Sequence, residues 1–281
     1  MFKKATKKNA KLRLALFGVS GAGKTMSALR IAKGIVGENG KIAVIDTERR
    51  SACKYADRFD FDVCELDKPT VNNLKLTIEK AKDYDVLIVD SMTHSWLELI
   101  AEVEQLAKAK FGGNTWSAWS EGTPKQLSLI NSLLDFPGHI IATMRVETNW
   151  TTITNEKGKV VPVRVGEAPK QGKGIEYEFD MLMQMSQDHN AIVIKDRTGK
   201  YQDEVIPLPD EDFGKALADW LNEIPPEKEP TLEEIAEKVL ECQTVQELTK
   251  FFKEIKNMSD DIKNLFTSRK EFLQNANNNQ S

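Results

Sequence analysis

Short apolar runs alternate with amphipathic segments along the first half of the chain. Each run has the length of a strand, and each amphipathic segment repeats its apolar residues every three or four positions. This alternation is typical of a mostly parallel sheet covered on both faces, and it predicts an α/β fold. The predicted strands are Lys11–Phe17, Lys41–Asp46, Asp85–Asp90 and His139–Met144. The predicted helices are Thr25–Val36, Val71–Lys82, Ser95–Lys110, Pro124–Leu134 and, later, Phe213–Leu221.

After the fourth predicted strand the pattern becomes β-rich, with short polar turns between the runs. Such spacing predicts hairpins, and we expect them to form an antiparallel extension of the same sheet. The first predicted hairpin consists of two runs within Asn149–Val165, on either side of Asn155–Gly158. The second consists of Phe179–Met185 and Ala191–Asp196, on either side of Gln187–Asn190. One more short strand is predicted after the turn Arg197–Lys200 and ends near Pro207.

The pattern also divides the chain into segments. We expect a basic N-terminal tail at 1–10, a core domain at 11–223, a linker at 224–230, a small helical module at 231–274 and a disordered tail at 275–281. The module is either an interaction unit or a stabilising appendage of the core. Its predicted helices are Thr231–Cys242, Thr244–Lys256 and Ser259–Leu273, and the pairs Thr231 with Glu234 and Thr244 with Glu247 have capping-box spacing.

Composition restricts the class of protein further. The 281 residues carry a net charge of −4, so nucleic-acid binding does not follow from the total charge. Six basic residues between Lys3 and Arg13 precede any acidic one, and they form either a solubilising tail or a phosphate-contacting arm. No apolar run is long enough for a signal peptide or a membrane span, so we expect a cytoplasmic protein with no membrane partner. Three scattered cysteines argue against a disulfide framework and a structural zinc site.

One motif carries clear chemistry. Gly18–Thr25 (GVSGAGKT) matches the P-loop pattern and lies between a predicted strand and a predicted helix. Glycines let backbone N–H groups turn toward a phosphate, and the start of the helix adds its positive dipole end. We therefore expect ATP to be bound here, with the lysine reaching the β- and γ-phosphates. The expected nucleotide-binding residues are Gly18, Ser20, Gly21, Ala22, Gly23, Lys24, Thr25 and Met26.

Magnesium accompanies the nucleotide at such sites, and it needs oxygen ligands. The Thr25 hydroxyl is one expected ligand. Asp90 ends the apolar run VLIVD, which is the Walker-B arrangement and makes it the second. The alternative is that Asp90 only caps the helix that follows it.

Hydrolysis needs a group that orients the attacking water, but the residue after Asp90 is Ser91. Glu48, just beyond the second predicted strand, is the candidate general base because ligands bind at the carboxyl ends of strands in open α/β sheets. The alternative is a surface loop acid. Thr143 and Arg145, at the end of the fourth predicted strand, are candidates for sensing the γ-phosphate, unless Arg145 is simply solvated.

These features together resemble a family. The segments IDTE (45–48) and IVDS (88–91) are similar to a RecA-type recombinase ATPase, in which the catalytic glutamate follows the second strand and corresponds to Glu48. The segments IATMR (141–145), GIEYEFD (174–180), DHN (188–190) and KDRTG (195–199) resemble phage-encoded AAA-type ATP-binding proteins with a minimal RecA-like core. Some of these are single-strand-annealing recombination proteins. The resemblance covers about residues 10–222.

The resemblance implies ATP-dependent work on single-stranded DNA, beside a single-strand-binding protein, and a homo-oligomer. RecA-like proteins complete the ATP site with basic residues of a neighbouring subunit, and Lys170 and Lys173 are the candidates here. The similar phage proteins often carry an arginine in this stretch, but this chain has none between Arg164 and Arg197. The sequence also shows no evident N-terminal oligomerisation domain.

Two segments could contact DNA through aromatic and basic side chains. The predicted loop Gly112–Gly122 carries Trp116 and Trp119, which either face DNA or form one face of a short helix packed on the core. The segment Asn149–Arg164 offers Trp150, Lys157, Lys159 and Arg164.

Two other functions stay open at this stage. One is a nucleotide-dependent switch with little hydrolysis. The other is a P-loop enzyme acting on a small molecule, which is disfavoured because no arginine-rich lid is present between Thr93 and Gly138.

Overall fold

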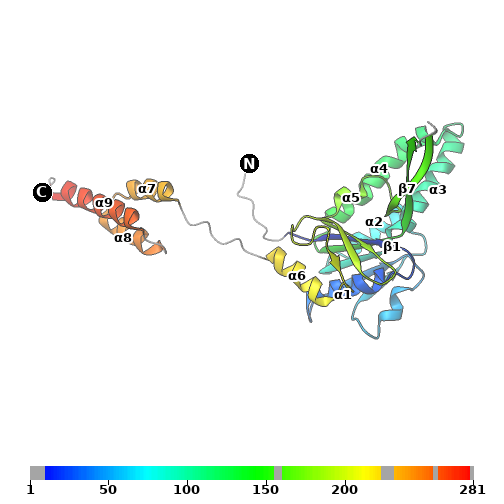
Figure 1. Ribbon diagram of the computed structural model, residues 1–281, viewed down its shortest axis with the longest axis horizontal. Coiled ribbons are helices and arrows are strands. Elements are labelled where there is room, and N and C mark those ends of the chain that lie inside the picture. The colour runs from blue at the N-terminus through cyan, green and yellow to red at the C-terminus, as the bar shows by residue number, and fades with distance from the viewer. Residues whose placement is uncertain (1–9, 155–159, 223–230, 256–258, 279–281) are drawn as a thin grey trace. The chain divides into compact units, whose positions relative to one another are not determined.

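The computed structural model describes residues 10–154, 160–222, 231–255 and 259–278 (Figure 1). The chain divides into two units, Met1–Glu223 and Ile224–Ser281. The basic residues before Ala10, the turn Asn155–Lys159 and the predicted linker lie outside the described residues.

The first unit is built on an eight-stranded sheet with the order β10-β9-β8-β1-β5-β4-β2-β3. The strands from β3 to β8 in this order are all parallel, and β9 and β10 add an antiparallel edge. The predicted mostly parallel α/β fold with an antiparallel extension is therefore confirmed. The strands are β1 (Arg13–Gly18), β2 (Ile42–Asp46), β3 (Asp62–Glu65), β4 (Val86–Asp90), β5 (His139–Met144), β8 (Met181–Met185), β9 (Ala191–Asp196) and β10 (Val205–Ile206).

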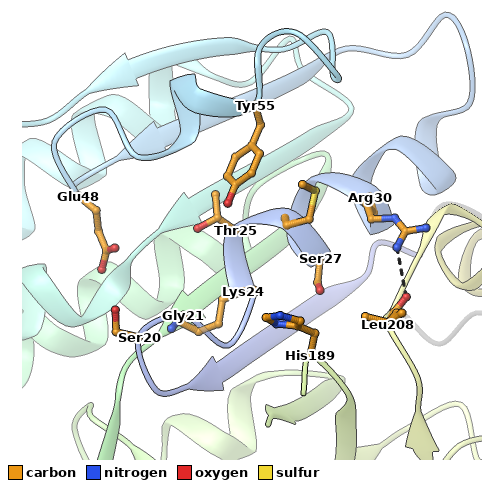
Figure 2. Close-up of a pocket in the computed structure, with 12 residues that line it drawn as sticks. Ser20, Gly21, Lys24, Thr25, Ser27, Arg30, Glu48, Tyr55, His189 and Leu208 are labelled. Carbon is orange, nitrogen blue, oxygen red and sulfur yellow. Dashed lines mark hydrogen bonds between the residues drawn. The ribbon is translucent and has the colours of Figure 1, made fainter. Parts of the chain in front are cut away.

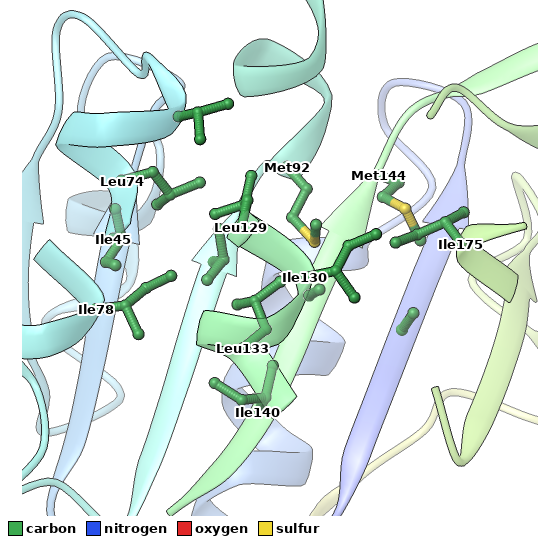
Figure 3. Packing of buried hydrophobic residues seen from close by; sticks show 14 of the residues in the cluster. Ile45, Leu74, Ile78, Met92, Leu129, Ile130, Leu133, Ile140, Met144 and Ile175 are labelled. Atoms are coloured by element: carbon green, nitrogen blue, oxygen red, sulfur yellow. The ribbon is translucent and has the colours of Figure 1, made fainter. Parts of the chain in front are cut away.

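Helices cover both faces of this sheet, and each face has its own apolar core. Alternate strand residues such as Ile45 and Ile140 pack under α2, α3 and α4 (Figure 3), whereas Leu16 and Ile88 pack under α1 and α6. Strands β1, β2 and β4 are buried along their whole length because both of their faces are covered. The helices are α1 (Lys24–Val36), α2 (Val71–Lys80), α3 (Met92–Lys110), α4 (Thr115–Leu134), the short α5 (Ile175–Glu178) and α6 (Glu211–Asn222).

Helix α4 corrects the prediction of a loop at Gly112–Gly122. The helix begins at Thr115, because the Asn114 side chain caps it by accepting a hydrogen bond from the Ser117 N–H at 3.1 Å. It continues through Gly122 and Pro124, two residues that disfavour a helix locally. A Cβ on Gly122 would lie 2.5 Å from the Val103 Cγ2 atom, so the glycine allows α3 and α4 to approach closely. Tertiary packing therefore outweighs the local propensity.

Three strand assignments also change. The short edge strand β3 was not predicted. It lies between the predicted strand Lys41–Asp46 and the predicted helix Val71–Lys82, and all four of its residues are exposed. The predicted first hairpin exists as β6 (Val146–Thr154) and β7 (Val160–Pro169), but it forms a separate two-stranded sheet. Strand β8 pairs parallel with β1, so only β9 and β10 form the antiparallel extension.

Arg13 lies in β1, within the predicted strand Lys11–Phe17, and it is buried although it is charged. Its guanidinium donates to the backbone carbonyl of the preceding residue and to three carbonyls between the end of α4 and the start of β5. The acceptors are the oxygens of Leu12 (3.2 Å), Leu134 (2.8 Å), Phe136 (2.5 Å) and Gly138 (2.8 Å). Arg13 therefore satisfies carbonyls at the end of α4 that the helix itself leaves unpaired.

Helices α1 and α6 lie against each other at glycines, next to the sheet (Figure 1). A Cβ on Gly214 would lie 2.2 Å from the Ile31 carbonyl oxygen, and one on Gly34 would lie 2.0 Å from the Glu211 carbonyl oxygen. Both obstacles are backbone atoms, so neither can move without shifting a helix.

We expect Gly214→Ala to lower the free energy of unfolding by about 1–3 kcal/mol, the usual cost of overpacking. The higher helix propensity of alanine contributes at most about 1 kcal/mol in the other direction. Urea unfolding measures the difference, with the exposed neighbour Lys215→Ala as the control. A Gly214→Ala protein as stable as wild type would mean that the two helices separate easily.

His139 makes stability depend on pH. Its Nδ1 accepts a hydrogen bond from the Leu12 N–H at 3.1 Å, which requires an unprotonated nitrogen. Burial, followed by the charges of Lys11 and Arg13, lowers the pKa of His139 from 6.5 to about 4. The unfolded chain takes up this proton first, so the stability contributed by neutral His139 is lost as the pH falls from about 6.5 toward 4.

The size of this loss can be isolated with His139→Asn, whose amide oxygen can accept from Leu12 without titrating. We expect the difference in unfolding free energy between pH 7 and pH 5 to be smaller in the variant than in wild type. Equal differences in urea unfolding would show that His139 does not carry the effect.

The second unit is a module of three helices with its own apolar core around Ile235, Leu248 and Phe266. Thr231 and Glu234 form the predicted capping box, and Thr244 accepts from the Glu247 N–H at 3.2 Å. The helices are α7 (Leu232–Glu241), α8 (Val245–Glu254) and α9 (Asp260–Asn278). Because α9 extends to Asn278, the segment predicted as a disordered tail is helical up to that residue. None of the helices in the described ranges combines the length and apolar character that crossing a membrane requires.

Candidate functional site

The predicted P-loop connects β1 to α1 as expected. Gly18 has no room for a side chain, because a Cβ would lie 2.6 Å from the Met185 carbonyl oxygen. Gly21 and Gly23 both have a φ of 84°, a conformation that favours glycine. Gly23 is also the N-cap of α1 and provides no side-chain acceptor. The first N–H groups of α1 are therefore left for an anion, which is the physical basis of phosphate binding at a helix start.

Lys24 begins α1 and folds back over the loop. Its ammonium donates to the carbonyl oxygens of Gly18 at 3.0 Å and Val19 at 2.8 Å. Burial lowers the pKa of Lys24, while the negative charges of Glu48 and Asp90 act in the opposite direction. The lysine therefore holds a positive charge in the middle of the loop, beside two carboxylates.

Thr25 and Asp90 meet, as the predicted magnesium site requires. The Thr25 hydroxyl donates to Asp90 Oδ2 at 2.7 Å, and the Thr143 hydroxyl donates to Asp90 Oδ1. Asp90 is only 1% exposed, and burial raises its pKa while the two hydroxyls lower it. Asp90 thus lies between two hydroxyl groups, and its hydrogen bonds do not go to the helix that follows it.

Glu48 lies beyond β2, on the same edge of the sheet. Buried Asp46 shapes the turn, since its carboxylate accepts from the backbone N–H groups of Glu48 at 2.6 Å and Ala52 at 3.0 Å. Arg145, after β5, donates to Glu48 Oε1 from Nε at 3.2 Å and from Nη2 at 3.1 Å. Among the described residues, Glu48 Oε2 has no hydrogen-bond partner. The glutamate is therefore held by one oxygen and has the other available.

A cavity of about 370 Å³ lies between the P-loop and Glu48 (Figure 2). Glu48 and Tyr55 lie on the side of β2 and the segment after it, while His189 comes from the turn before β9. Arg30 is held at the far wall by Glu211 at 2.9 Å and the Leu208 carbonyl at 3.4 Å. The lining residues are Ser20, Gly21, Gly23, Lys24, Thr25, Met26, Ser27, Arg30, Glu48, Tyr55, His189 and Leu208.

The structure adds Ser27, Arg30, Tyr55, His189 and Leu208 to the residues predicted for this site. His189 belongs to the DHN segment that carried the family resemblance, so it had a signal. Tyr55 lies in a short 3₁₀ helix, Ala52–Tyr55, between β2 and β3, and Leu208 follows the last short strand. Neither Tyr55 nor Leu208 lies in a periodic pattern or a motif. Only the fold brings their segments next to the P-loop, so they could not be predicted for this site.

Lys170 and Lys173 line neither this cavity nor the smaller one beside it. Lys170 is fixed through its backbone, because its N–H donates to the Arg145 carbonyl at 2.7 Å. Its own carbonyl accepts from the buried Thr93 hydroxyl at 3.3 Å, and that hydroxyl also accepts from the Arg145 N–H at 2.9 Å. The base of the β6–β7 hairpin is thus tied to the residue that holds Glu48.

The two tryptophans of α4 differ in their surroundings. Trp119 stacks on Trp96 with ring centroids 5.4 Å apart and packs against the core. Trp116 is 87% exposed. Of the two alternatives, packing on the core therefore holds for Trp119 and not for Trp116. In the hairpin, Lys157 and Lys159 lie outside the described residues, as do the side chains of Trp150 and Arg164.

Comparisons with known proteins give a similar solved structure and a family. A KaiC-like protein from the hyperthermophilic archaeon Pyrococcus horikoshii is 17% identical, with a TM-score of 0.38, over 68% of this chain and 82% of that one. No curated protein matches the chain significantly. The family model described as an AAA domain matches residues 10–206, more than half of the chain. The chain therefore belongs to the AAA domain family of P-loop NTPases, with Gly18–Thr25 as its P-loop.

Proposed function

We propose that this chain is a RecA-like ATPase that hydrolyses ATP with Mg²⁺ and acts on single-stranded DNA in recombination, annealing or replication. The observation that carries the ATPase part is one cavity lined by Lys24, Thr25 and Glu48. A phosphate-binding lysine, a candidate metal ligand and a carboxylate with a free oxygen face the same space. ATP hydrolysis needs these three functions together.

The side-chain oxygen atoms of Thr25 and Asp90 fit Mg²⁺ as ligands. This ion prefers oxygen ligands and takes only one or two carboxylates from the protein, with phosphates and waters completing its shell. The buried Asp90 carboxylate also has a raised pKa, which a nearby cation would lower. When bound there, Mg²⁺ would neutralise charge on the phosphates.

The chain's own residues account for the remaining chemistry. Lys24 would contact the β- and γ-phosphates, and the N–H groups at the start of α1 would donate to the phosphate oxygens. Glu48 would orient a water molecule and accept its proton at Oε2, while Arg145 keeps Oε1 in position. Arg30, His189 and Leu208 line the cavity away from Glu48, and we assign that part to the nucleoside.

Three features support single-stranded DNA as the partner. The family resemblance implies it, Trp116 offers an exposed aromatic face, and the β6–β7 hairpin begins directly after Arg145. Aromatic platforms beside basic segments are the usual means of binding single strands. Thr93 and Lys170 are hydrogen bonded to Arg145, which holds Glu48. DNA bound on the hairpin would therefore affect the position of Glu48 through these hydrogen bonds.

The decisive experiment measures ATP turnover with and without single-stranded DNA, using duplex DNA as the comparison. We expect single strands to stimulate turnover in wild type and to have no effect in Glu48→Ala. Turnover without any response to DNA would refute the DNA part of the proposal. ATP binding with negligible turnover under every condition would instead support a nucleotide-dependent switch.

We also propose that a second copy of the chain completes the site with Lys170 or Lys173. The exposed Lys173 is the better test, because Lys170 is engaged through its backbone. If Lys173→Ala leaves DNA-stimulated hydrolysis unchanged, Lys173 does not act as such a residue. A single-strand-binding protein is a further proposed partner, to be sought by co-sedimentation.

A further inference from the structure

A second, smaller cavity adjoins the nucleotide cavity. Its volume is about 310 Å³, and its lining is Thr47, Glu48, Arg49, His94 and Arg145. Glu48 is the residue that both cavities share. The two cavities therefore meet at the candidate general base.

Positive charge dominates this lining. Arg49 and Arg145 provide two guanidiniums, and Glu48 provides the single carboxylate. Arg145 is paired with Glu48, but Arg49 forms no ion pair with any residue in the described part of the chain. His94 is hydrogen bonded through Nδ1 to Thr47 Oγ1 at 2.8 Å, and burial together with Arg145 lowers its pKa. The cavity thus has an uncompensated cation and polar groups that suit an oxyanion.

The backbone supports a specific role for Arg49. Its φ of 55° lies in the left-handed region, and so does the φ of 67° at Arg50. Two adjacent non-glycine residues in this conformation are uncommon and cost free energy, and such strain gathers at ligand sites. The turn gives the two arginines different surroundings. Arg50 pairs with Glu65 at 2.9 Å on β3, whereas Arg49 lines the cavity.

We propose that this cavity is a site for inorganic phosphate, which receives the phosphate that ATP hydrolysis releases. The proposal rests on the proposed ATPase function and deepens it. In that reaction the water oxygen bonds to the γ-phosphorus, and the bond from phosphorus to the bridging oxygen breaks. ADP keeps the electron pair, and Glu48 accepts the water proton.

Proton uptake by Glu48 links the two cavities. A neutral glutamic acid no longer compensates the charge of Arg145, so the lining changes from two cations and one anion to two cations. The attraction for a dianionic phosphate rises at the moment when the phosphate forms. Arginine suits this role, because its planar guanidinium donates two parallel hydrogen bonds to phosphate.

The test is titration of inorganic phosphate into the full chain saturated with ADP and Mg²⁺, at constant ionic strength, by calorimetry. We expect saturable binding in wild type and at least about 10-fold weaker binding in Arg49→Ala, because charged hydrogen bonds are lost. Phosphate should also inhibit ATP turnover as a product, and Arg49→Ala should weaken that inhibition by a similar factor.

Arg50→Ala is the matched control, since Arg50 has the same backbone conformation and lines neither cavity. We expect it to bind phosphate like wild type. Equal losses of phosphate affinity in Arg49→Ala and Arg50→Ala, or no loss of phosphate affinity in Arg49→Ala, would overturn the proposal. So would a weaker affinity of Arg49→Ala for single-stranded DNA with unchanged phosphate binding, because the cavity would then hold a nucleic-acid phosphate.

The phosphate titration needs neither turnover nor DNA. A protein that fails to respond to DNA can therefore still bind phosphate in this cavity, and a DNA-stimulated ATPase can still lack this site. The two proposals can fail separately.

Discussion

Glu48→Gln is expected to lower ATP turnover by about 10²–10⁴-fold, the contribution of a well-positioned general base. Glutamine keeps the size of the side chain and can still meet Arg145, but it cannot accept the proton of the attacking water. ATP binding with Mg²⁺ should change little, because the phosphates are held by Lys24 and the P-loop. Steady-state turnover and the dissociation constant of a fluorescent ATP analogue measure the two quantities separately.

Glu65→Gln provides the matched control. Glu65 is the same residue type and pairs in register with Asp46 at the end of the neighbouring strand, but it lines neither cavity. Its variant should turn over ATP like wild type. If Glu48→Gln kept wild-type turnover, the base would have to be another group, and the case for hydrolysis at this cavity would lose its main support.

Arg13→Met is expected to lower the free energy of unfolding by about 3 kcal/mol or more. Methionine fills a similar volume, but it leaves several partly or fully buried carbonyls without their donor, and each unsatisfied buried group costs about 1–3 kcal/mol. Chemical denaturation measures the loss. Arg13→Lys should lose less, because an ammonium can still reach some of the four carbonyls.

Arg197→Met is the control for this prediction, since Arg197 pairs with Asp180 while its side chain is 58% exposed. An exposed ion pair contributes at most about 1 kcal/mol. If Arg13→Met and Arg197→Met were equally stable, the carbonyls around the turn before β5 would have found other donors, such as water. A variant too unstable to purify leaves Arg13→Lys to decide the question.

The chemical core of the site could be predicted from local sequence. The P-loop residues Gly18–Thr25 carry their own conformation, since glycines at 21 and 23 permit the required backbone and the helix start follows at once. Asp90 could be placed because it ends a fully apolar run, and Glu48 because it follows another. Parallel strands bring their carboxyl ends to one edge, so both residues had to lie near the P-loop once the fold class was known.

What surrounds this core was decided by tertiary structure. The Glu48–Arg145 pair joins residues from different strand ends, and Tyr55 and Leu208 reach the cavity from segments without a distinctive pattern. Helix α4 shows the same effect in the fold, since its packing against Val103 retains Gly122 and Pro124 within a helix. Local sequence determines conformations that need only neighbouring residues. Contacts between distant segments depend on how the whole sheet brings them together, so they could not be predicted from the sequence alone.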